Sequence, residues 1–262
     1  MSEQRIGIAV AGAAGRMGQV IIGLLKEHPR ACLAAALERS GHPDLGRPVG
    51  PDILITDDLA GALQKAAVLI DFTTPAATLE HLAAAKKAGR PIVIGTTGLS
   101  PEEMETIRAA GREIALLASP NMSPGVNLLF RLTAEAASRL KDYQVEIVEA
   151  HHDRKVDAPS GTALRLAEIV AADRNQDLKT AAVYGRSGRC GPRPDGEIGI
   201  HAIRVADVVG EHTVIFGAAG ERLELHHRAT SRQTFATGAI RAALFLVDRK
   251  PGFYSMAEVL GI

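Results

Sequence analysis

The chain has little of what would tie it to several large classes of protein. Its 262 residues include only two cysteines, Cys32 and Cys190, which form neither a disulfide framework nor a repeated metal-ligand pattern. Basic and acidic residues number 30 each, so no excess positive charge points to nucleic acid as the main partner. No apolar run approaches the roughly 20 residues that span a bilayer, and the first residues do not resemble a cleavable signal peptide. We therefore expect a cytoplasmic protein whose partners are neither membranes nor nucleic acids.

In the first half of the chain, short aliphatic runs alternate with helical patterns. Buried strands are predicted at 5–12, 32–38, 67–73, 91–97 and 113–119. Helices are predicted between them at 18–28, 76–89 and 101–111, with Gly89 and Gly111 as helix stops. This alternation predicts an α/β domain with a doubly wound parallel sheet of the Rossmann type, extending over residues 1–122.

After Gly125 the pattern changes to that of an α+β domain with an open mixed sheet, extending over residues 123–232. Helices are predicted at 126–140 and 161–173, a strand at 143–152, and two or three antiparallel strands within 200–230. A long apolar helix follows at 232–249. The open sheet needs a cover, and oligomerisation through it is one way to provide that cover.

The motif GAAGRMG, with glycines at positions 12, 15 and 18, directly follows the first predicted strand and opens the first helix. At that place the pyrophosphate of a dinucleotide would lie against backbone N–H groups. The spacing is G-x-x-G-x-x-G rather than the common G-x-G-x-x-G, so a tight strand-to-helix connection without a nucleotide is the alternative interpretation.

Glu38 and Arg39 stand at the end of the second predicted strand, where an acidic residue often binds the adenosine ribose. Arg39 could stack on the adenine or pair with a 2′-phosphate. The neighbouring acid and base suggest use of both NADH and NADPH, and the alternative is a solvated ion pair. The segments 95–98 and 119–125 end two further strands at the edge where open α/β sheets bind ligands.

The segment 149–164, EAHHDRKVDAPSGTAL, combines proton-transfer groups with a possible anion site. Ser160 is a good helix N-cap, and the N–H groups of Gly161 and Thr162 would be presented at a positive helix end, one loop away from Lys155. This favours binding of a substrate carboxylate, although Ser160 could simply cap a structural helix. The adjacent residues 151 and 152 point to opposite faces of a strand, so these histidines are not expected to form one ligand pair.

Other protein classes fit these patterns less well. A redox-sensing NAD-binding regulator would not need two histidines, Lys155 and an anion-binding helix start in one segment. A metal-dependent hydrolase lacks support, because no H-E-x-x-H or paired-cysteine spacing is present. His226 and His227 are therefore interpreted as sheet or interface residues, and no metal is expected. Another NAD(P)-dependent imine or amino-acid dehydrogenase remains the nearest alternative.

Taken in order, GAAGRMG, ER at 38–39, GTTG, NMSPGVN, the 149–164 segment, VGEHTVIF and SRQTFATGAIRAALFL resemble the 4-hydroxy-tetrahydrodipicolinate reductase family, also called dihydrodipicolinate reductase. The resemblance extends over essentially the whole chain. It implies reduction of a cyclic dicarboxylate by NADH or NADPH in the diaminopimelate/lysine pathway. It also implies a homotetramer built through the substrate-domain sheets, and a last segment, 233–262, that completes the dinucleotide domain.

The resemblance also implies roles for individual residues. Those expected to bind the cofactor are Gly12, Ala13, Ala14, Gly15, Arg16, Met17, Glu38, Arg39, Gly95, Thr96, Thr97, Ser119, Pro120, Asn121 and Met122. Those expected to serve catalysis or bind the substrate are His151 as the acid/base group, Lys155 as a proton donor and carboxylate contact, and His152, Gly161 and Thr162. Many relatives have an aromatic residue where this chain has Met122, and a small residue where it has Pro120.

Overall fold

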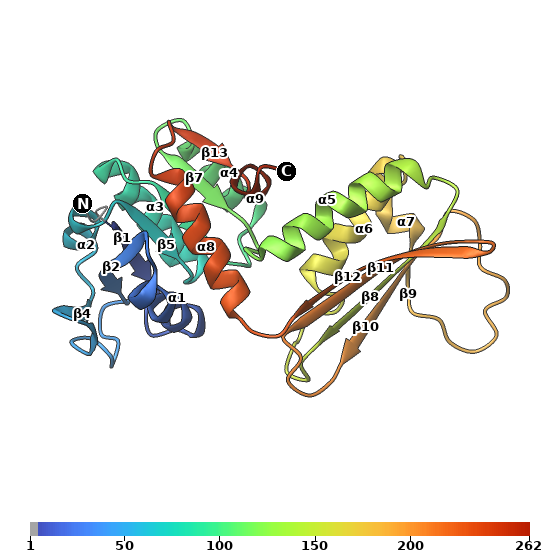
Figure 1. Cartoon of the computed structure of the whole chain (residues 1–262), viewed down its shortest axis with the longest axis horizontal. Coiled ribbons are helices and arrows are strands. Elements are labelled where there is room, and N and C mark those ends of the chain that lie inside the picture. Colours follow the sequence, from blue (N-terminus) through green and yellow to red (C-terminus); the bar gives the residue numbers. More distant parts are fainter. Residues whose placement is uncertain (1–4) are drawn as a thin grey trace. The chain divides into compact units, whose positions relative to one another are not determined.

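The computed structural model describes residues 5–262, which form two compact units (Figure 1). One unit comprises the chain up to Pro124 together with Arg232–Gly261, and the other comprises Gly125–Ser231. No helix within residues 5–262 combines the length and apolar character needed to cross a membrane.

The first unit is built on an eight-stranded sheet with the strand order β13-β7-β6-β5-β1-β2-β4-β3. All of its pairings are parallel except that of β3 with β4. Its strands are β1 Ile6–Ala11, β2 Ala31–Leu37, β3 Pro48–Gly50, β4 Ile53–Thr56, β5 Val68–Asp71, β6 Ile92–Ile94, β7 Ala115–Ala118 and β13 Gly252–Tyr254. Strand β1 lies between β5 and β2, so the strands that follow it are added first on one side of β1 and later on the other. This reversal creates the switch point where ligands bind in such sheets. The predicted Rossmann-type sheet is confirmed.

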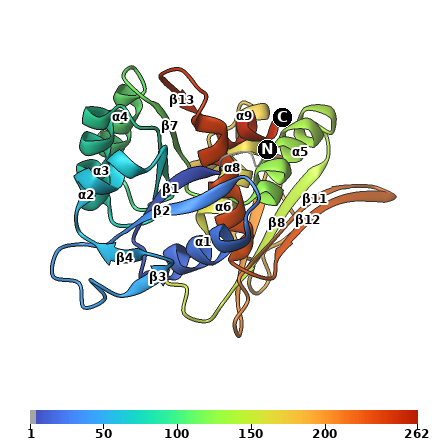
Figure 2. The ribbon, with the colours of Figure 1, turned by 60° about the vertical axis from the view of Figure 1, so that its left-hand side comes forward.

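Helices cover both faces of this sheet. One face carries α1 Arg16–Glu27 and α8 Gln233–Leu246, while α2 Leu59–Lys65, α3 Pro75–Ala88 and α4 Pro101–Ala110 lie together on the other (Figure 2). The buried side chains accordingly form two separate clusters, one on each face. The short helix α9 Met256–Leu260 follows β13. The short elements β3, β4, β13, α2 and α9 were not predicted from the sequence.

Both predicted helix stops lie at helix ends, but for different physical reasons. Gly89 ends α3 in the left-handed conformation, with φ of 62°, which a glycine adopts at little cost. Gly111 ends α4 in a right-handed conformation, with φ of −59°. A side chain there would place its Cβ only 3.0 Å from the backbone nitrogen of Phe253, so close packing on β13 rather than the turn requires this glycine.

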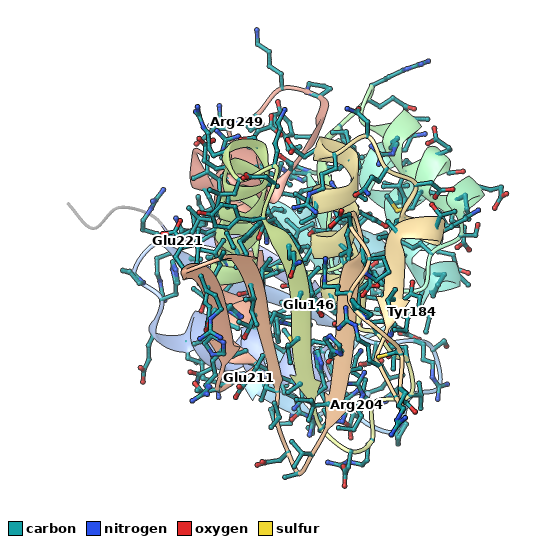
Figure 3. The ribbon with its side chains drawn as sticks, turned by 90° about the vertical axis from the view of Figure 1, so that its right-hand side faces the viewer. Glu146, Tyr184, Arg204, Glu211, Glu221 and Arg249 are labelled. Carbon is teal, nitrogen blue, oxygen red and sulfur yellow. The ribbon has the colours of Figure 1, made fainter. Side chains whose placement is uncertain are left out.

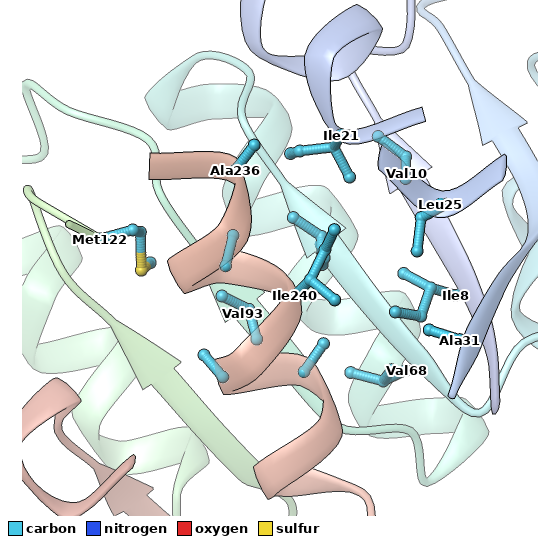
Figure 4. Packing of buried hydrophobic residues seen from close by; sticks show 14 of the residues in the cluster. Ile8, Val10, Ile21, Leu25, Ala31, Val68, Val93, Met122, Ala236 and Ile240 are labelled. Atoms are coloured by element: carbon cyan, nitrogen blue, oxygen red, sulfur yellow. The ribbon is translucent and has the colours of Figure 1, made fainter. Parts of the chain in front are cut away.

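Helix α8 packs into the core of the first unit, although the whole second unit separates it in sequence from strands β1 to β7. Figure 4 shows Ala236 and Ile240 of α8 among Val93, Met122 and the β1 side chains. Its small residues let the helix lie close to the sheet, and Ala239, Ala242 and Ala243 are fully buried. Burial of this apolar surface is what fixes the end of the chain to the first unit.

The second unit contains a five-stranded mixed sheet with the order β12-β11-β8-β10-β9. Its elements are α5 Pro124–Arg139, β8 Gln144–His151, α6 Gly161–Asp173, α7 Leu178–Ala181, β9 Ala182–Tyr184, β10 Ile198–Arg204, β11 Gly210–Ala218 and β12 Glu221–Ala229. Helices α5 and α6 cover one face, where Val145 and Ile147 of β8 are buried against them. The open mixed sheet expected for this domain is therefore present.

Of the two or three antiparallel strands predicted within residues 200–230, two pair in that way, β11 and β12. Strand β10 lies parallel to β8 and does not pair with β11, because β8 separates the two. The chain passes from β8 through α6 and α7 to β9, and the loop 185–197 then returns it to the start of β10, so that β8, β9 and β10 are all parallel. Only β11 and β12 form the expected antiparallel hairpin.

The other face of this sheet has no covering helix within its own unit. Figure 3 shows Glu146 of β8 among the strands, with Arg204 near the end of β10. Residues that alternate with the buried ones, such as Val148 and Ile203, lie on this open face, and Ile203 is 47% exposed. We call it the open sheet face below.

Candidate functional site

The glycine loop after β1 has the close backbone packing that a dinucleotide-binding turn requires. Gly12 has φ of 76°, and a Cβ there would lie 2.5 Å from the backbone oxygen of Phe72. A Cβ on Gly18 would lie 2.1 Å from the oxygen of Gly12. Residues larger than glycine would therefore push the loop away from the sheet edge, and two of the three motif glycines are explained by packing alone.

The N-terminus of α1 is suited to an anion. Its N-cap, Gly15, has no side chain to cap the first turn, and the first turn contains no acidic residue. Arg16, at the first helical position, is exposed beside these N–H groups. A phosphate would thus find free N–H groups, the positive helix end and a cation together.

A hollow of about 430 Å³ opens beside this loop, at the carboxyl edge of the sheet. Its lining includes nine of the residues expected to bind the cofactor: Gly15, Arg16, Met17, Gly95, Thr96, Thr97, Pro120, Asn121 and Met122. It also includes four residues that the sequence analysis did not name: Phe72, Thr73, Arg232 and Phe235. Phe72 and Thr73 directly follow β5, so their position after a buried strand could have revealed them. Arg232 and Phe235 lie at the start of α8, and only the fold brings that helix to this edge of the sheet.

A buried hydrogen-bond network supports the floor of this hollow. Asp71, which is completely buried at the end of β5, accepts a hydrogen bond from the Thr73 hydroxyl at 2.6 Å and lies 3.0 Å from His81 Nδ1. The hydroxyl of Thr96 accepts hydrogen bonds from the Thr73 backbone N–H and from Thr78 Oγ1. The loops after β5 and β6 are thereby held to each other beneath the hollow.

Glu38 and Arg39 lie at the end of β2, as expected, but Glu38 has a partner in the loop itself. Its Oε1 accepts a hydrogen bond from the Ala14 N–H at 2.9 Å, which fixes the carboxylate against the glycine loop. Arg39 is exposed. Glu38 is therefore anchored beside the N-terminus of α1, whereas Arg39 is exposed to solvent.

The segment 119–123 is organised by its own side chains. Ser119 Oγ donates to the Asn121 carbonyl at 2.9 Å, and Asn121 Oδ1 accepts from the Ser123 N–H at 2.9 Å. Ser123 Oγ lies 3.1 Å from Thr234 Oγ1, which ties the segment to the start of α8. The side chain of Met122 is only 1% exposed and packs in the core (Figure 4), so it borders the hollow from beneath rather than facing it.

In the second unit, the end of β8 brings His151 next to a buried carboxylate that the sequence analysis did not name. His151 Nδ1 lies 2.6 Å from Oε2 of Glu149, whose side chain is completely buried. The two residues are separated by one position and therefore share a face of the strand. The alternation of side chains along a strand could have revealed Glu149, because a residue two positions before His151 lies on the same face of the strand.

Glu149 has further partners on two neighbouring elements. Arg204, at the end of β10, donates to both carboxylate oxygens at 2.8 Å, and the Ser160 N–H donates to Oε1 at 3.0 Å. Burial alone would raise the pKa of Glu149, but these hydrogen bonds, with that from His151, hold it at about 2. The carboxylate is therefore charged near neutral pH.

The start of α6 lies against this carboxylate. Ser160 caps the helix, with its Oγ accepting from the Ala163 N–H at 3.2 Å, and the same Oγ lies 3.2 Å from His212 Nε2. Gly161 and Thr162 form the first turn, which has no acidic residue. The expected helix start is thus present, and Glu149 connects it to His151 in one network of hydrogen bonds. Its binding of an anion remains a prediction.

Lys155 lies in the loop between β8 and α6. Its Nζ donates to both oxygens of Asp157, at 2.8 and 2.9 Å. Asp157 is exposed, and its backbone oxygen accepts from Arg204 at 2.8 Å. The ammonium group of Lys155 is therefore held by an exposed carboxylate, which the carboxylate of a ligand could replace. Arg204 anchors the same loop to the end of β10.

Three further histidines lie at the end of β8 and on β12. His152 is half-buried just after β8, and His226 on β12 lies 2.8 Å from Thr213 Oγ1 of β11, on the open sheet face. His227 is half-buried on the other side of the same strand. No cluster of three or more potential metal ligands occurs in the part of the chain from residue 5 onward.

Comparison with known proteins gives matches along nearly the whole chain. Residues 6–122 match a family model described as the N-terminus of dihydrodipicolinate reductase, and residues 125–260 match one described as its C-terminus. A 4-hydroxy-tetrahydrodipicolinate reductase of Nitrosomonas europaea is 50% identical over 264 residues, covering 98% of each chain. One of Aromatoleum aromaticum is 49% identical, covering 97% of this chain and 95% of the relative.

Solved structures show the same similarity. A dipicolinate-bound dihydrodipicolinate reductase from Paenisporosarcina sp. TG-14 gives a TM-score of 0.80 at 25% identity, covering 97% of this chain and 99% of that one. A diaminopimelate dehydrogenase of C. glutamicum in complex with DAP gives a TM-score of 0.55 at 17% identity, covering 98% and 94%. The second comparison concerns the fold alone.

Proposed function

The chain belongs to the dihydrodipicolinate reductase family, and from this we propose that it reduces 4-hydroxy-tetrahydrodipicolinate to tetrahydrodipicolinate with NADH or NADPH. The protein is an oxidoreductase of the diaminopimelate/lysine pathway. Its N-terminal domain takes a nicotinamide cofactor, and its substrate is a small molecule. Because the cofactor and the precursors of amino acids are metabolites of the cytoplasm, that is where the reaction takes place.

The residues around the glycine loop fit a dinucleotide. The free N–H groups at the start of α1 and the exposed Arg16 would hold the phosphates. Glu38 and Arg39 would contact the adenosine end, and the 430 Å³ hollow between Gly95–Thr97 and the 119–122 segment would take the nicotinamide. When bound, the reduced nicotinamide supplies the hydride.

The observation that carries the proposal is that the buried carboxylate of Glu149 holds both His151 and the start of α6, while Arg204 links it to the loop of Lys155. The substrate is a cyclic dicarboxylate with a conjugated imine. One substrate carboxylate would bind the N–H groups of Gly161 and Thr162 and the ammonium of Lys155, with His152 as a further contact. The dipicolinate that the Paenisporosarcina relative binds is likewise a six-membered nitrogen ring with two carboxylates, which supports this class of ligand.

Loss of water from C4 of the 4-hydroxy compound leaves a C4=C5 double bond conjugated with the imine. Hydride addition at C4 then places negative charge on C5 and the ring nitrogen, and one proton added at C5 completes tetrahydrodipicolinate. His151 is the acid/base group in this proposal, because its Nδ1 is held by Glu149 and its other ring nitrogen is left for the substrate. Lys155 supplies a second proton donor once the substrate carboxylate replaces Asp157. Acid-base assistance of this kind contributes about 10²–10⁴-fold to the rate.

Another imine or amino-acid dehydrogenase is the remaining alternative, because proteins of that kind share the fold. A redox-sensing regulator would bind the cofactor equally well but would not turn over. Both alternatives predict no consumption of NADH with this substrate, which separates them from the proposed reaction.

The test is steady-state oxidation of NADH, with the substrate made in situ from pyruvate and aspartate semialdehyde by the preceding synthase. Wild-type protein should oxidise NADH only when the synthase and both of its substrates are present. His151→Gln should lower kcat with a smaller change in KM, whereas Lys155→Ala should lower kcat and raise KM for the dicarboxylate. NADH affinity should stay within twofold in both variants. If wild-type protein oxidised no NADH under these conditions, the proposed reaction would be wrong.

The assembly that goes with this function is a homotetramer. The open sheet face carries Val148, Ile203 and Ile215, none of which is buried, and no helix of its own unit covers it. Pairing of this face with that of a second copy would remove apolar surface from water.

A further inference from the structure

Glu149 uses all of its acceptor capacity on three groups that belong to different parts of the substrate domain. Oε2 accepts from His151 Nδ1 at 2.6 Å and from Arg204 at 2.8 Å. Oε1 accepts from the Ser160 N–H at 3.0 Å and from Arg204 at 2.8 Å. Each oxygen therefore receives two hydrogen bonds, and a carboxylate with no exposed surface has no water to replace any of them.

This arrangement determines which nitrogen of His151 carries the proton. An ionised carboxylate can only accept hydrogen bonds, so the ring nitrogen that faces it, Nδ1, must be protonated. Nε2 has no partner among residues 5–262, and the side chain keeps 12% of its surface exposed. In the neutral ring the lone pair is thus on Nε2, the one position from which His151 can take up and give away a proton.

The space around Nε2 is also controlled. A Cβ on Gly210, the first residue of β11, would lie 3.1 Å from Nε2. That distance is closer than an ordinary carbon contact, so a methyl group there would displace the ring or crowd its reactive edge. On the same strand, Gly217 has room for a methyl group, whose nearest neighbour would be 3.8 Å away.

A purely structural function for the Glu149–Arg204 pair is the competing explanation. Strand β8 offers an internal comparison, because Glu146 also binds two arginines and a histidine, Arg186, Arg193 and His201. Glu146 lies on the opposite face of the strand and touches no residue of the proposed substrate site. Arg204, in contrast, also donates to the backbone oxygen of Asp157 in the Lys155 loop. Glu149 and Arg204 therefore connect His151, the start of α6 and the loop of Lys155. An ion pair that only stabilised two neighbouring strands would not need these contacts.

We propose that Glu149 and Arg204 are positioning residues for the reduction: Glu149 keeps His151 protonated on Nδ1 with Nε2 free for proton exchange, and Arg204 keeps Glu149 in place. This inference rests on the proposed function, because it needs His151 to be the acid/base group. Neither positioning residue touches the reacting atoms. Their effect is on the tautomer and orientation of a group that does.

The first test compares Glu149→Gln with Glu146→Gln, the same change on the other face of the same strand. Glutamine preserves the size of the side chain but can donate to His151, which allows the other tautomer. We expect Glu149→Gln to lower kcat about 10²-fold, within the range of acid-base assistance, with KM for the dicarboxylate changed less than threefold and the NADH dissociation constant unchanged. Glu146→Gln should retain kcat within twofold. An equal loss in both variants, or none in Glu149→Gln, would overturn the proposal.

A second test does not depend on the folding of the Glu149 variant. In ¹⁵N spectra of the wild-type protein at a pH where His151 is neutral, its ring should show a protonated Nδ1 and an unprotonated Nε2, assigned by loss of the signals in His151→Gln. Gly210→Ala should lower kcat without changing any charge, whereas Gly217→Ala should not. A neutral ring protonated on Nε2, or equal activity in the two glycine variants, would contradict the positioning of His151 even if Glu149→Gln did not fold.

The kinetics of His151→Gln separate this inference from the function on which it rests. If His151→Gln lowers kcat but Glu149→Gln and Gly210→Ala do not, His151 acts as proposed and the positioning inference fails. If His151→Gln keeps wild-type kcat, the acid/base role itself is wrong, and the positioning inference falls with it.

Discussion

Gly238, in the middle of α8, lies directly against the backbone of Met122: a Cβ on this glycine would be 1.7 Å from the Met122 oxygen. The carbonyl group therefore occupies the space that a side chain on the helix would fill. The contact joins residues 116 positions apart and, with the Ser123–Thr234 hydrogen bond, fixes the 119–123 segment beside the proposed nicotinamide hollow.

Gly238→Ala should consequently destabilise the protein and weaken cofactor binding together. Alanine is the better helix former, but the overlap with the Met122 oxygen forces the helix or the segment to move, which typically costs about 1–3 kcal/mol. The measurements are the free energy of unfolding in urea and the NADH dissociation constant by fluorescence.

Gly23→Ala is the matched control for this substitution. Gly23 also lies within a helix, α1, but a Cβ there meets nothing within 4 Å. It should stabilise the protein by up to about 1 kcal/mol and leave NADH binding unchanged. If Gly238→Ala behaved like Gly23→Ala, the contact with Met122 would not constrain this region.

The elements that the sequence predicted well are those whose pattern is local. The strands β1, β2, β5, β6 and β7 of the first unit and helix α6 follow from aliphatic runs, helical periodicity and a capping serine. The direction of β10 did not follow, because alternation along a strand is the same in parallel and antiparallel sheets. The connections from β8 to β9 and from β9 to β10 decide the direction, and the alternation of side chains does not reveal them.

The candidate sites show the same limit. The glycine loop, the α6 start and His151 were visible as short motifs. Arg204 was not, because its partner Glu149 is 55 residues away. Asp71 was not, because its partners Thr73 and His81 form no recognised motif with it. Both networks contain a completely buried carboxylate, Asp71 in one and Glu149 in the other. The burial of a single polar residue produces no repeating pattern from which the sequence could predict it.

Cofactor preference should respond to Arg39 in a specific way. Glu38 is anchored to the Ala14 N–H and places negative charge where a 2′-phosphate would lie, whereas the exposed Arg39 can pair with that phosphate. We expect wild-type affinities for NADH and NADPH to agree within about tenfold, a gap of about 1.4 kcal/mol. Arg39→Ala should weaken NADPH more than NADH, as measured by titration with each cofactor.

An exposed arginine at the other end of the strands provides the control. Arg112 follows α4 just before the amino end of β7, so Arg112→Ala should affect neither cofactor. Equal weakening of NADH and NADPH in Arg39→Ala would mean that Arg39 stacks on the adenine or is structural, and does not recognise the phosphate.

The proposed tetramer gives a prediction for the open sheet face. Light scattering at micromolar concentration should give a mass about four times the 27.6 kDa of the chain. Ile203→Glu, which places a charge on this face, should lower the mass, because a buried unpaired charge is strongly unfavourable. Leu128→Glu is the control, since Leu128 is similarly exposed, at 43%, but lies on α5. A monomeric wild-type protein would rule out this assembly.

The last prediction concerns acid stability and begins with His212, which is 3% exposed beside His151 and Ser160. Burial, and then the positive charge that His151 can carry, lower the pKa of His212 to about 3. In the unfolded chain its pKa returns to about 6.5. Between these values the unfolded state binds the proton and the folded state does not.

The sign of the effect follows from that difference. Stability due to the neutral, buried His212 is fully present above pH 6.5 and is lost as the pH falls from 6.5 toward 3, at up to about 1.4 kcal/mol per pH unit. Glu149, whose pKa is lowered to about 2, contributes stability that is lost only below its unfolded value of 4.5. The two groups therefore act in different pH windows.

His212→Gln should separate them, because an amide can still bond to Ser160 Oγ but does not titrate. We expect the free energy of unfolding to fall less steeply between pH 6.5 and 5 in this variant than in wild type, and to fall as before below pH 4.5. His227, whose pKa burial also lowers, should leave a residual slope, which His227→Gln should remove separately. If His212→Gln had the wild-type slope between pH 6.5 and 5, His212 would accept a proton in the folded protein, and the group between β8, β11 and α6 would hold one more charge than its hydrogen bonds indicate.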